Sequence, residues 1–205
     1  KDENEEVLDI KGNIITAGFI DIHTHVYHGE TAIGIDPDKV GVELGVTSVI
    51  DAGTSGADTF EDFYNRIIKN SKTKVFAFLN IASLGLKTLN ELNDMSNIDF
   101  EKIKKIVEKY KGTIVGIKAR ASASVVGENG IAPIKKAKEI AKELGIPIMV
   151  HIGNAPPKVE EVLNLLEKGD IVTHCYHNKE NNLVKDIGML EEALEAKKRG
   201  VLFDI

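Results

Sequence analysis

Residues 113–154 read TIVGIKARASASVVGENGIAPIKKAKEIAKELGIPIMVHIGN. The segment starts with an apolar run over 113–122 and ends with another over 146–154. Between these runs, residues 132–145 place apolar side chains at helical spacing, and Gly145 stands where that pattern stops. A helix between two short apolar runs predicts two parallel strands joined by a crossover helix. The segment therefore indicates an α/β fold.

The same alternation extends over most of the chain. Strands are predicted from Ile20 and over 45–53, 74–82, 113–122, 146–154 and 170–178, with a seventh opening at Val201. Helices are predicted between them over 58–70, 98–112, 132–145, 157–169 and 189–200. An eight-stranded (β/α) barrel has ~250 residues. We therefore expect a TIM-like (β/α)8 barrel, truncated here to about its first seven strands. A doubly wound open sheet is the rival architecture, but no glycine-rich phosphate loop follows the first strand.

The first residues follow a different pattern. Residues 5–18, EEVLDIKGNIITAG, read as a β-hairpin that turns at 11–13. A lone hairpin is a poor stand-alone unit in water. We therefore expect residues 1–17 to be the remnant of a small β domain and residues 18–205 to form the partial barrel.

The composition excludes several classes of protein. Of 205 residues, 42% are hydrophobic and 28% are charged, which is an ordinary globular balance. No run approaches the ~20 consecutive apolar residues of a membrane helix, and a net charge of −6 does not favour nucleic acid as a partner. The single cysteine, Cys175, excludes an internal disulfide and fits a reducing cytoplasm. We expect a cytoplasmic homo-oligomer that acts on a small molecule.

Residues 18–29 read GFIDIHTHVYHG and are polar for a buried strand. Side chains two apart in a strand share a face, so we expect Asp21, His23 and His25 on one face and Ile22 on the face toward the helices. Two imidazoles at this spacing can converge on one metal ion. The alternative is a pair of structural histidines that bind backbone groups. We expect Asp21 to be a structural polar group inside the barrel.

Two further histidines strengthen the metal hypothesis. His151 closes the apolar run of 146–154, and His174 follows the apolar start of 170–178. The carboxyl ends of barrel strands are where functional side chains are presented. Buried imidazoles each need partners, so packing alone explains such a set poorly. Imidazole ligands suit zinc or a similar first-row ion.

Lys118 occupies a strand that should be buried, although lysines are almost never fully buried without a partner. Beside two divalent cations, the pKa of its ammonium group should fall. The neutral amine can take up carbon dioxide and form a carbamate, an anionic ligand with two oxygens that can bridge two metals. The alternative is a rim lysine that reaches solvent or pairs with an acid.

Four motifs on successive strands together resemble the metal-dependent amidohydrolase superfamily, in particular its dihydroorotase-like deacetylase branch. The motifs are GFIDIHTH (18–25), GIKARAS (116–122), IMVHIG (148–153) and THCYHN (173–178). The resemblance implies that His23 and His25 bind one metal, that carboxylated Lys118 bridges it to a second, and that the second is also bound by His151 and His174. Two divalent ions, zinc by default, would be the cofactors.

The resemblance implies a binuclear hydrolase that cleaves an amide or ester bond by metal-bound hydroxide, in the manner of a deacetylase. An aspartate at the end of strand eight completes that family's site as general acid and base, and this chain as written lacks it. Asp204 belongs to the seventh strand and is not given that role. The alternatives are a cyclic amidohydrolase such as a dihydroorotase or hydantoinase, a phosphotriesterase-like hydrolase, a mononuclear deaminase and a non-catalytic metal-binding barrel.

The remaining site candidates rest on position alone. Asp51, at the end of the second strand, could hydrogen-bond a ligand histidine or cap the following turn. Tyr27 and His28 follow the histidine pair and are candidate substrate contacts. Arg120 could meet a substrate carboxylate or form an ion pair at the rim, and the ion pair is preferred. Cys175 is expected to be a small buried residue that points away from the metals.

Overall fold

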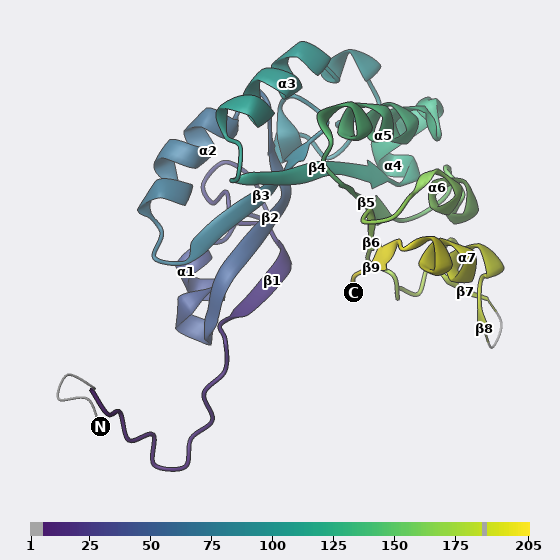
Figure 1. Cartoon of the computed structure of the whole chain (residues 1–205). Coiled ribbons are helices and arrows are strands. Elements are labelled where there is room, and N and C mark those ends of the chain that lie inside the picture. Colours follow the sequence, from purple (N-terminus) through teal and green to yellow (C-terminus); the bar gives the residue numbers. More distant parts are fainter. Residues whose placement is uncertain (1–5, 186–187) are drawn as a thin grey trace.

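The computed structural model describes residues 6–185 and 188–205, and its main feature is a seven-stranded parallel sheet. Its strands lie side by side in chain order, as β1-β2-β3-β4-β5-β6-β9, and every neighbouring pair is parallel. The strands are β1 (Phe19–Thr24), β2 (Val46–Gly56), β3 (Lys74–Asn80), β4 (Ile114–Ala121), β5 (Ile148–Ile152), β6 (Ile171–Thr173) and β9 (Leu202–Phe203). The sheet curls, so that β1 and β9 approach each other (Figure 1). The expected (β/α) barrel architecture and its seven strands are confirmed.

Helices follow the strands and cover the outside of the curl (Figure 1). They are α1 (Pro37–Val40), α2 (Phe60–Arg66), α3 (Phe100–Lys109), α4 (Ala123–Val126), α5 (Ala132–Leu144), α6 (Val159–Leu165) and α7 (Glu191–Arg199). The five predicted helices are present, although α2 is short and a 3-10 turn over Ile68–Asn70 follows it. None of the helices in the described part of the chain is long and apolar enough to cross a membrane.

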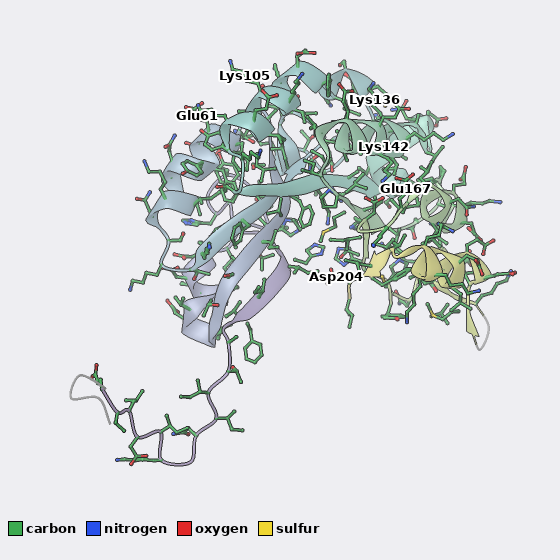
Figure 2. The ribbon with its side chains drawn as sticks, viewed as in Figure 1. Glu61, Lys105, Lys136, Lys142, Glu167 and Asp204 are labelled. Carbon is green, nitrogen blue, oxygen red and sulfur yellow. The ribbon has the colours of Figure 1, made fainter. Side chains whose placement is uncertain are left out.

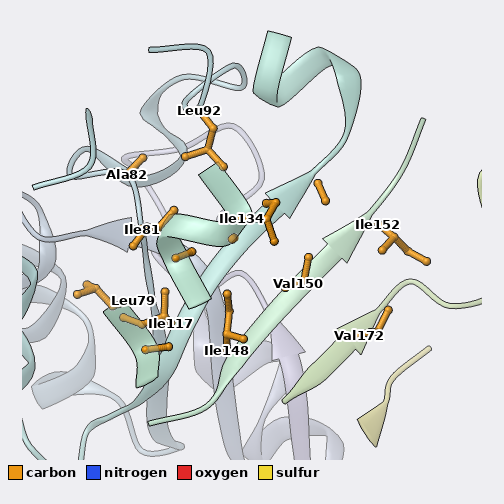
Figure 3. Packing of buried hydrophobic residues seen from close by; sticks show 14 of the residues in the cluster. Leu79, Ile81, Ala82, Leu92, Ile117, Ile134, Ile148, Val150, Ile152 and Val172 are labelled. Carbon is orange, nitrogen blue, oxygen red and sulfur yellow. The ribbon is translucent and has the colours of Figure 1, made fainter. Parts of the chain in front are cut away.

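The main core lies between the sheet and these helices (Figure 3). Ile148, Val150 and Ile152 alternate along β5 and are buried on this side, and Ile117 of the neighbouring β4 joins them. The helix α5 adds Ile134 to the same cluster. This alternation follows from the period of two in a strand, so the other β5 side chains enter the curl.

A smaller apolar cluster fills the inside of the curl. Ala52, Phe78, Met149 and Ile171 form it, and Ile22 packs against it. We expected Ile22 on the helix side, and that expectation was wrong. The pairing of β1 with β2 shifts register between Asp21 and Thr24, which breaks simple alternation. Asp21 is exposed rather than inside, and its carboxylate accepts a hydrogen bond from the backbone N–H of His23 at 3.0 Å.

The hairpin expected over 5–18 is absent from its described part, residues 6–18. The turn forms as predicted, because Lys11 and Gly12 have left-handed backbones and the Asn13 N–H donates to the Ile10 carbonyl at 2.9 Å. No strand flanks it within those residues, and the segment runs away from the barrel (Figure 1). Val7, Leu8, Ile14 and Ile15 are exposed, so no packed layer supports pairing. The assignment of residues 1–17 to a small β domain stays a prediction.

The segment after β6 also differs from the prediction. We expected a strand over 170–178, but β6 ends at Thr173, and a small antiparallel hairpin of β7 (Val184–Lys185) and β8 (Gly188–Met189) precedes α7. The shorter strand leaves His174 immediately outside the sheet, on the loop that starts at its carboxyl end.

Candidate metal centre

The curl brings the four predicted histidines together at the carboxyl ends of β1, β5 and β6. The ring centroids of His23 and His25 are 5.5 Å apart, those of His23 and His174 are 4.6 Å apart, and those of His174 and His151 are 4.8 Å apart. All four residues are partly buried. Residues far apart in the sequence therefore form one continuous imidazole cluster.

His174 has an unusual backbone. Its φ is 63°, in the left-handed region that residues with a Cβ seldom adopt. The strand ends one residue earlier, so this turn directs the imidazole toward His23 and His151 instead of continuing the strand. Backbone strain of this kind is concentrated at functional sites.

Lys118 lies in β4 beneath this cluster and is only 2% exposed. Its Nζ lies 3.3 Å from Sδ of Met149, a weak acceptor. Within the described residues no carboxylate forms a hydrogen bond or an ion pair with Nζ. Burial lowers the pKa of the Lys118 ammonium to about 7, although the charges of Asp204 and Asp51 oppose that shift. A large share of Lys118 is therefore the neutral amine near neutral pH.

Gly53 makes room for the lysine. Its φ is +83°, and a Cβ at this position would lie 2.5 Å from both Cβ and Cγ of Lys118. Asn80, the last residue of β3, donates its amide hydrogen to the Gly53 carbonyl at 2.9 Å and holds this backbone in place. Only glycine fits both the backbone conformation and the space.

The histidines are neutral as well. Burial, and then the charge of Lys118, lowers the pKa of His23 and of His25 to about 3. Burial and the neighbouring His174 lower the pKa of His151 to about 2, and burial lowers the pKa of His174 itself. Neutral imidazole is the form that binds a metal.

Hydroxyl groups contact the Nδ1 atoms of the paired histidines. Oγ1 of Thr173 lies 2.6 Å from Nδ1 of His23, and Oγ1 of Thr54 lies 2.8 Å from Nδ1 of His25. Asp204 follows β9 and places Oδ2 at 3.2 Å from the same Nδ1 of His23. The sequence patterns predicted neither threonine nor this contact. The sequence does carry a signal for Thr173, because it is a polar residue at the end of an apolar run and immediately precedes His174.

The residues present fit a metal centre, provided that Lys118 takes part. Across residues 6–185 and 188–205, no three His, Cys, Asp or Glu side chains are arranged to hold a metal ion by themselves. The four imidazoles are neutral, and those of His23 and His25 have Nδ1 occupied, which leaves Nε2 to bind a cation. The carbamate of Lys118 would add the anionic oxygens that the cluster needs.

Asp51 lies within β2, which continues to Gly56, so it does not cap a turn after the strand, and it contacts no histidine directly in the described structure. Its buried carboxylate accepts hydrogen bonds from the N–H groups of Thr54 at 2.7 Å and Val26 at 2.8 Å. Burial raises the pKa of Asp51 to about 6, while these hydrogen bonds lower it. Asp51 therefore orders the backbone on either side of the site, next to His25 and at Thr54.

Arg120 forms the preferred ion pair. Its Nη1 donates to both carboxylate oxygens of Glu91, at 3.2 and 3.1 Å, and Glu91 is 2% exposed. Burial raises the pKa of Glu91, and the charge of Arg120 opposes the shift. The charge of Arg120 also lowers the pKa values of His25 and His151, so the guanidinium lies within electrostatic reach of the centre.

Tyr27 is not placed to contact a substrate. It is 1% exposed, packs against Phe63 with ring centroids 4.8 Å apart, and donates its hydroxyl hydrogen to Asp62 at 2.6 Å. Its position after the histidine pair made it a candidate substrate contact, but the aromatic ring fills the core between β1 and α2. His28, the next residue, is exposed. Cys175 is buried as expected, and burial raises the pKa of its thiol to about 11.

Comparison with known proteins agrees with this geometry. The model of the amidohydrolase family matches residues 14–204, which is almost the whole chain. The chain belongs to the amidohydrolase family. The resemblance carried by the four motifs is confirmed, and the match covers the strands that hold the histidines and Lys118.

Relatives within the family carry several names. A protein named deacetylase from Enterococcus faecalis is 43% identical over 197 residues, covering 95% of this chain and 53% of that protein. A crystal structure described as an adenine deaminase has a TM-score of 0.89 at 43% identity, covering 92% of this chain and 52% of the other. Another, described as a dihydroorotase, has a TM-score of 0.85 at 39% identity, covering 92% and 51%. The chain thus spans about half the length of these family members.

Proposed function

We propose that this chain carries the binuclear metal centre of a hydrolase that cleaves an amide or ester bond in an acylated small molecule. The observation that supports this most strongly is Lys118, a buried lysine with a pKa of about 7 whose charge reaches four neutral imidazoles. A structural lysine would be paired with a carboxylate. The deacetylase name of the Enterococcus faecalis relative supports the choice of an acyl bond.

Each ligand has a proposed role. His23 and His25 would hold one cation, and His151 and His174 would hold the second. Lys118, after its amine adds to carbon dioxide and releases one proton, would supply an anionic ligand to both. Divalent cations, zinc by preference, would supply an acidified water and polarise the substrate carbonyl. Arg120, with Nη1 held by Glu91, directs its remaining N–H donors to a polar group of the substrate. His28, which is exposed, is a further proposed contact with the substrate.

The test is metal content together with direct detection of the carbamate. The protein that carries this chain is prepared with zinc and ¹³C-bicarbonate, beside Lys118→Ala and the exposed-lysine control Lys102→Ala. We expect two metals per chain and one carbamate ¹³C resonance in the parent and in the control. Lys118→Ala should lose the resonance and at least one metal. A parent with no metal, or equal metal content in all three proteins, would refute the proposal.

Two other chemistries each have a specific observation in their favour. The dihydroorotase name favours a cyclic amide as substrate, and the adenine deaminase name favours deamination. A mononuclear deaminase would not need Lys118. A panel of N-acetyl and O-acetyl compounds, cyclic amides and adenine separates these possibilities. Acetate release supports the proposal, ring opening supports the cyclic amide, and ammonia release with unchanged activity in Lys118→Ala supports the deaminase. Metal binding without turnover would indicate a non-catalytic barrel.

A further inference from the structure

Asp204, Thr173 and His23 form a connected group across the curl of the sheet. Oγ1 of Thr173 lies 2.7 Å from Oδ2 of Asp204 and 2.6 Å from Nδ1 of His23. The three residues come from β9, β6 and β1, and β1 and β9 are the two edges of the sheet. Figure 2 shows Asp204 beside β9, on the side that faces β1. The contact therefore joins elements that the sheet's own hydrogen bonds do not connect.

The hydrogens in this group can be assigned by counting. A threonine hydroxyl has one hydrogen to donate, and a carboxylate can only accept. Thr173 donates that hydrogen to Asp204, so its oxygen must accept from His23. His23 therefore carries its hydrogen on Nδ1, and its Nε2 lone pair is left available. The side chains of His23 and Asp204 are only 11% and 16% exposed, which strengthens these bonds.

The backbone holds the carboxylate at this position. The Asp204 N–H donates to the Val172 carbonyl at 2.8 Å, and the Asp204 carbonyl accepts from the Cys175 N–H at 3.3 Å. Both contacts are to the residues around the end of β6, beside Thr173. The Asp204 backbone is thus tied to the end of β6, and its carboxylate lies beside Thr173.

A second histidine has a similar neighbour. Nδ1 of His25 lies 2.8 Å from Oγ1 of Thr54, and the backbone N–H of the same threonine donates to Asp51 at 2.7 Å. Each of the two neighbouring histidines thus has a threonine hydroxyl at Nδ1. Asp51 binds backbone N–H groups, whereas Asp204 binds the threonine hydroxyl and lies against the His23 ring.

We propose that Asp204 is a positioning residue for His23, which through Thr173 and by its own contact at 3.2 Å holds the ring in the Nδ1–H tautomer and turns Nε2 toward the metal centre. The consequence for metal binding rests on the proposed function. Partners of this kind behind a ligand histidine are worth about 10–100-fold in metal affinity. The tautomer itself requires no metal, so the two parts can be tested separately.

The experiment follows the His23 ring by ¹⁵N NMR in the metal-free protein and measures zinc affinity by competition with a chelator. Thr173→Val removes the hydroxyl at constant shape, Thr173→Ser keeps it, and Asp204→Asn replaces the carboxylate with an amide that can reverse the donor order. The control is Asp94→Asn, an exposed carboxylate in a loop. We expect the parent, Thr173→Ser and the control to show the Nδ1–H form. Asp204→Asn should populate the Nε2–H form and bind zinc about 10–100-fold more weakly, and Thr173→Val should do so to a smaller extent because the direct contact of Asp204 with Nδ1 remains.

Two results would overturn the inference. One is an unchanged Nδ1–H tautomer in Thr173→Val and Asp204→Asn, because the ring would then be held by something else. The other is loss of one whole equivalent of metal in Asp204→Asn with an unchanged tautomer, which would make Asp204 a ligand. A parent that binds no zinc would refute the proposed function, while the NMR measurement would still decide the role of Asp204.

Discussion

Two lysines near opposite ends of the sheet, one partly buried and one buried, show how differently one residue type can be used. Lys138 of α5 has a side chain 15% exposed, and its Nζ is paired with Asp170 at 2.5 Å and Glu167 at 3.3 Å. Lys118 of β4 is more deeply buried and has only the Met149 sulfur at hydrogen-bonding distance within the described residues. Asp170 precedes β6, at the amino end of the sheet, whereas Lys118 lies toward the carboxyl end. The ammonium group of Lys138 is therefore paired with carboxylates at the amino end, whereas that of Lys118 has no carboxylate partner within the described residues at the carboxyl end.

The difference separates a stabilising group from a reactive one. A buried ammonium without a carboxylate is expensive in free energy, and folding would be easier with an apolar residue. The unfavourable free energy of an unpaired ammonium arises at the carboxyl end of the barrel, where the four imidazoles lie. At the amino end, Lys138 is paired with carboxylates and no such cost arises. An unpaired buried lysine beside potential metal ligands is thus a better indicator of chemistry than the histidines alone.

The largest effect is expected from breaking the matched pair. Asp170 also accepts hydrogen bonds from the N–H groups of Ile148 and Glu167, so Asp170→Ala removes three partners at once. We expect the free energy of unfolding to fall by about 3–5 kcal/mol, measured by urea denaturation. Glu167→Gln, at the exposed partner, is the control and should change stability little. Equal effects of the two substitutions would show that the Lys138–Asp170 pair contributes no more to the free energy of unfolding than an exposed pair does.

Gly53→Ala would place a methyl group in the space that the Lys118 side chain occupies. It combines an unfavourable left-handed φ with a 2.5 Å contact to the lysine stem, and we expect a loss of about 2–4 kcal/mol in urea denaturation. Gly45→Ala is the matched control, because Gly45 has φ +81° and an added Cβ there would have nothing within 4 Å. Gly45→Ala should lose only about 1 kcal/mol. Equal losses would mean that Lys118 is not closely packed.

Replacing each lysine by methionine should change stability in opposite directions. Lys138→Met leaves Asp170 unpaired and is destabilising. Lys118→Met removes an unmatched charge, and we expect the metal-free chain to gain about 1–3 kcal/mol in urea denaturation. A loss of stability in metal-free Lys118→Met would contradict the conclusion that Lys118 is an unpaired buried charge, on which the proposed function rests.

The gain from Lys118→Met should depend on pH. The pKa of Lys118 falls from 10.5 in the unfolded chain to about 7 in the folded one, so between these values unfolding takes up a proton. The stability of the parent should therefore rise with pH across this window relative to the variant. The gain is expected to be complete below pH 7 and to shrink toward pH 10.5. A difference that is constant over this range would show that Lys118 keeps an ordinary pKa.

The smallest effect is expected for an exposed lysine. Lys102 pairs with Asp58 at 2.8 Å, but the two side chains are exposed, and solvent screens such pairs. Lys102→Ala should leave the urea midpoint and the metal content unchanged. A measurable loss would mean that surface pairs contribute more to this fold than their exposure suggests.

Local pattern was sufficient for the order of the elements. The apolar runs of β4 and β5 and the amphipathic α5 between them specify their structures through periods of two and 3.6, which depend only on near neighbours. Parallel strands then place their carboxyl ends together, so His151, His174 and Lys118 could be assigned to one rim from the sequence alone.

Local pattern failed where a contact spans the barrel or where a strand is irregular. The register shift in β1 placed Ile22 inside the curl, and core packing took Tyr27 away from the rim. The contacts of Thr173 and Asp204 with His23 join residues 150 and 181 positions apart. Such contacts exist only because the curl of the sheet brings its two edges together, and no short stretch of residues encodes that curvature. The elements and most of the proposed ligands follow from nearby residues, whereas the orientation of those ligands depends on the assembled barrel.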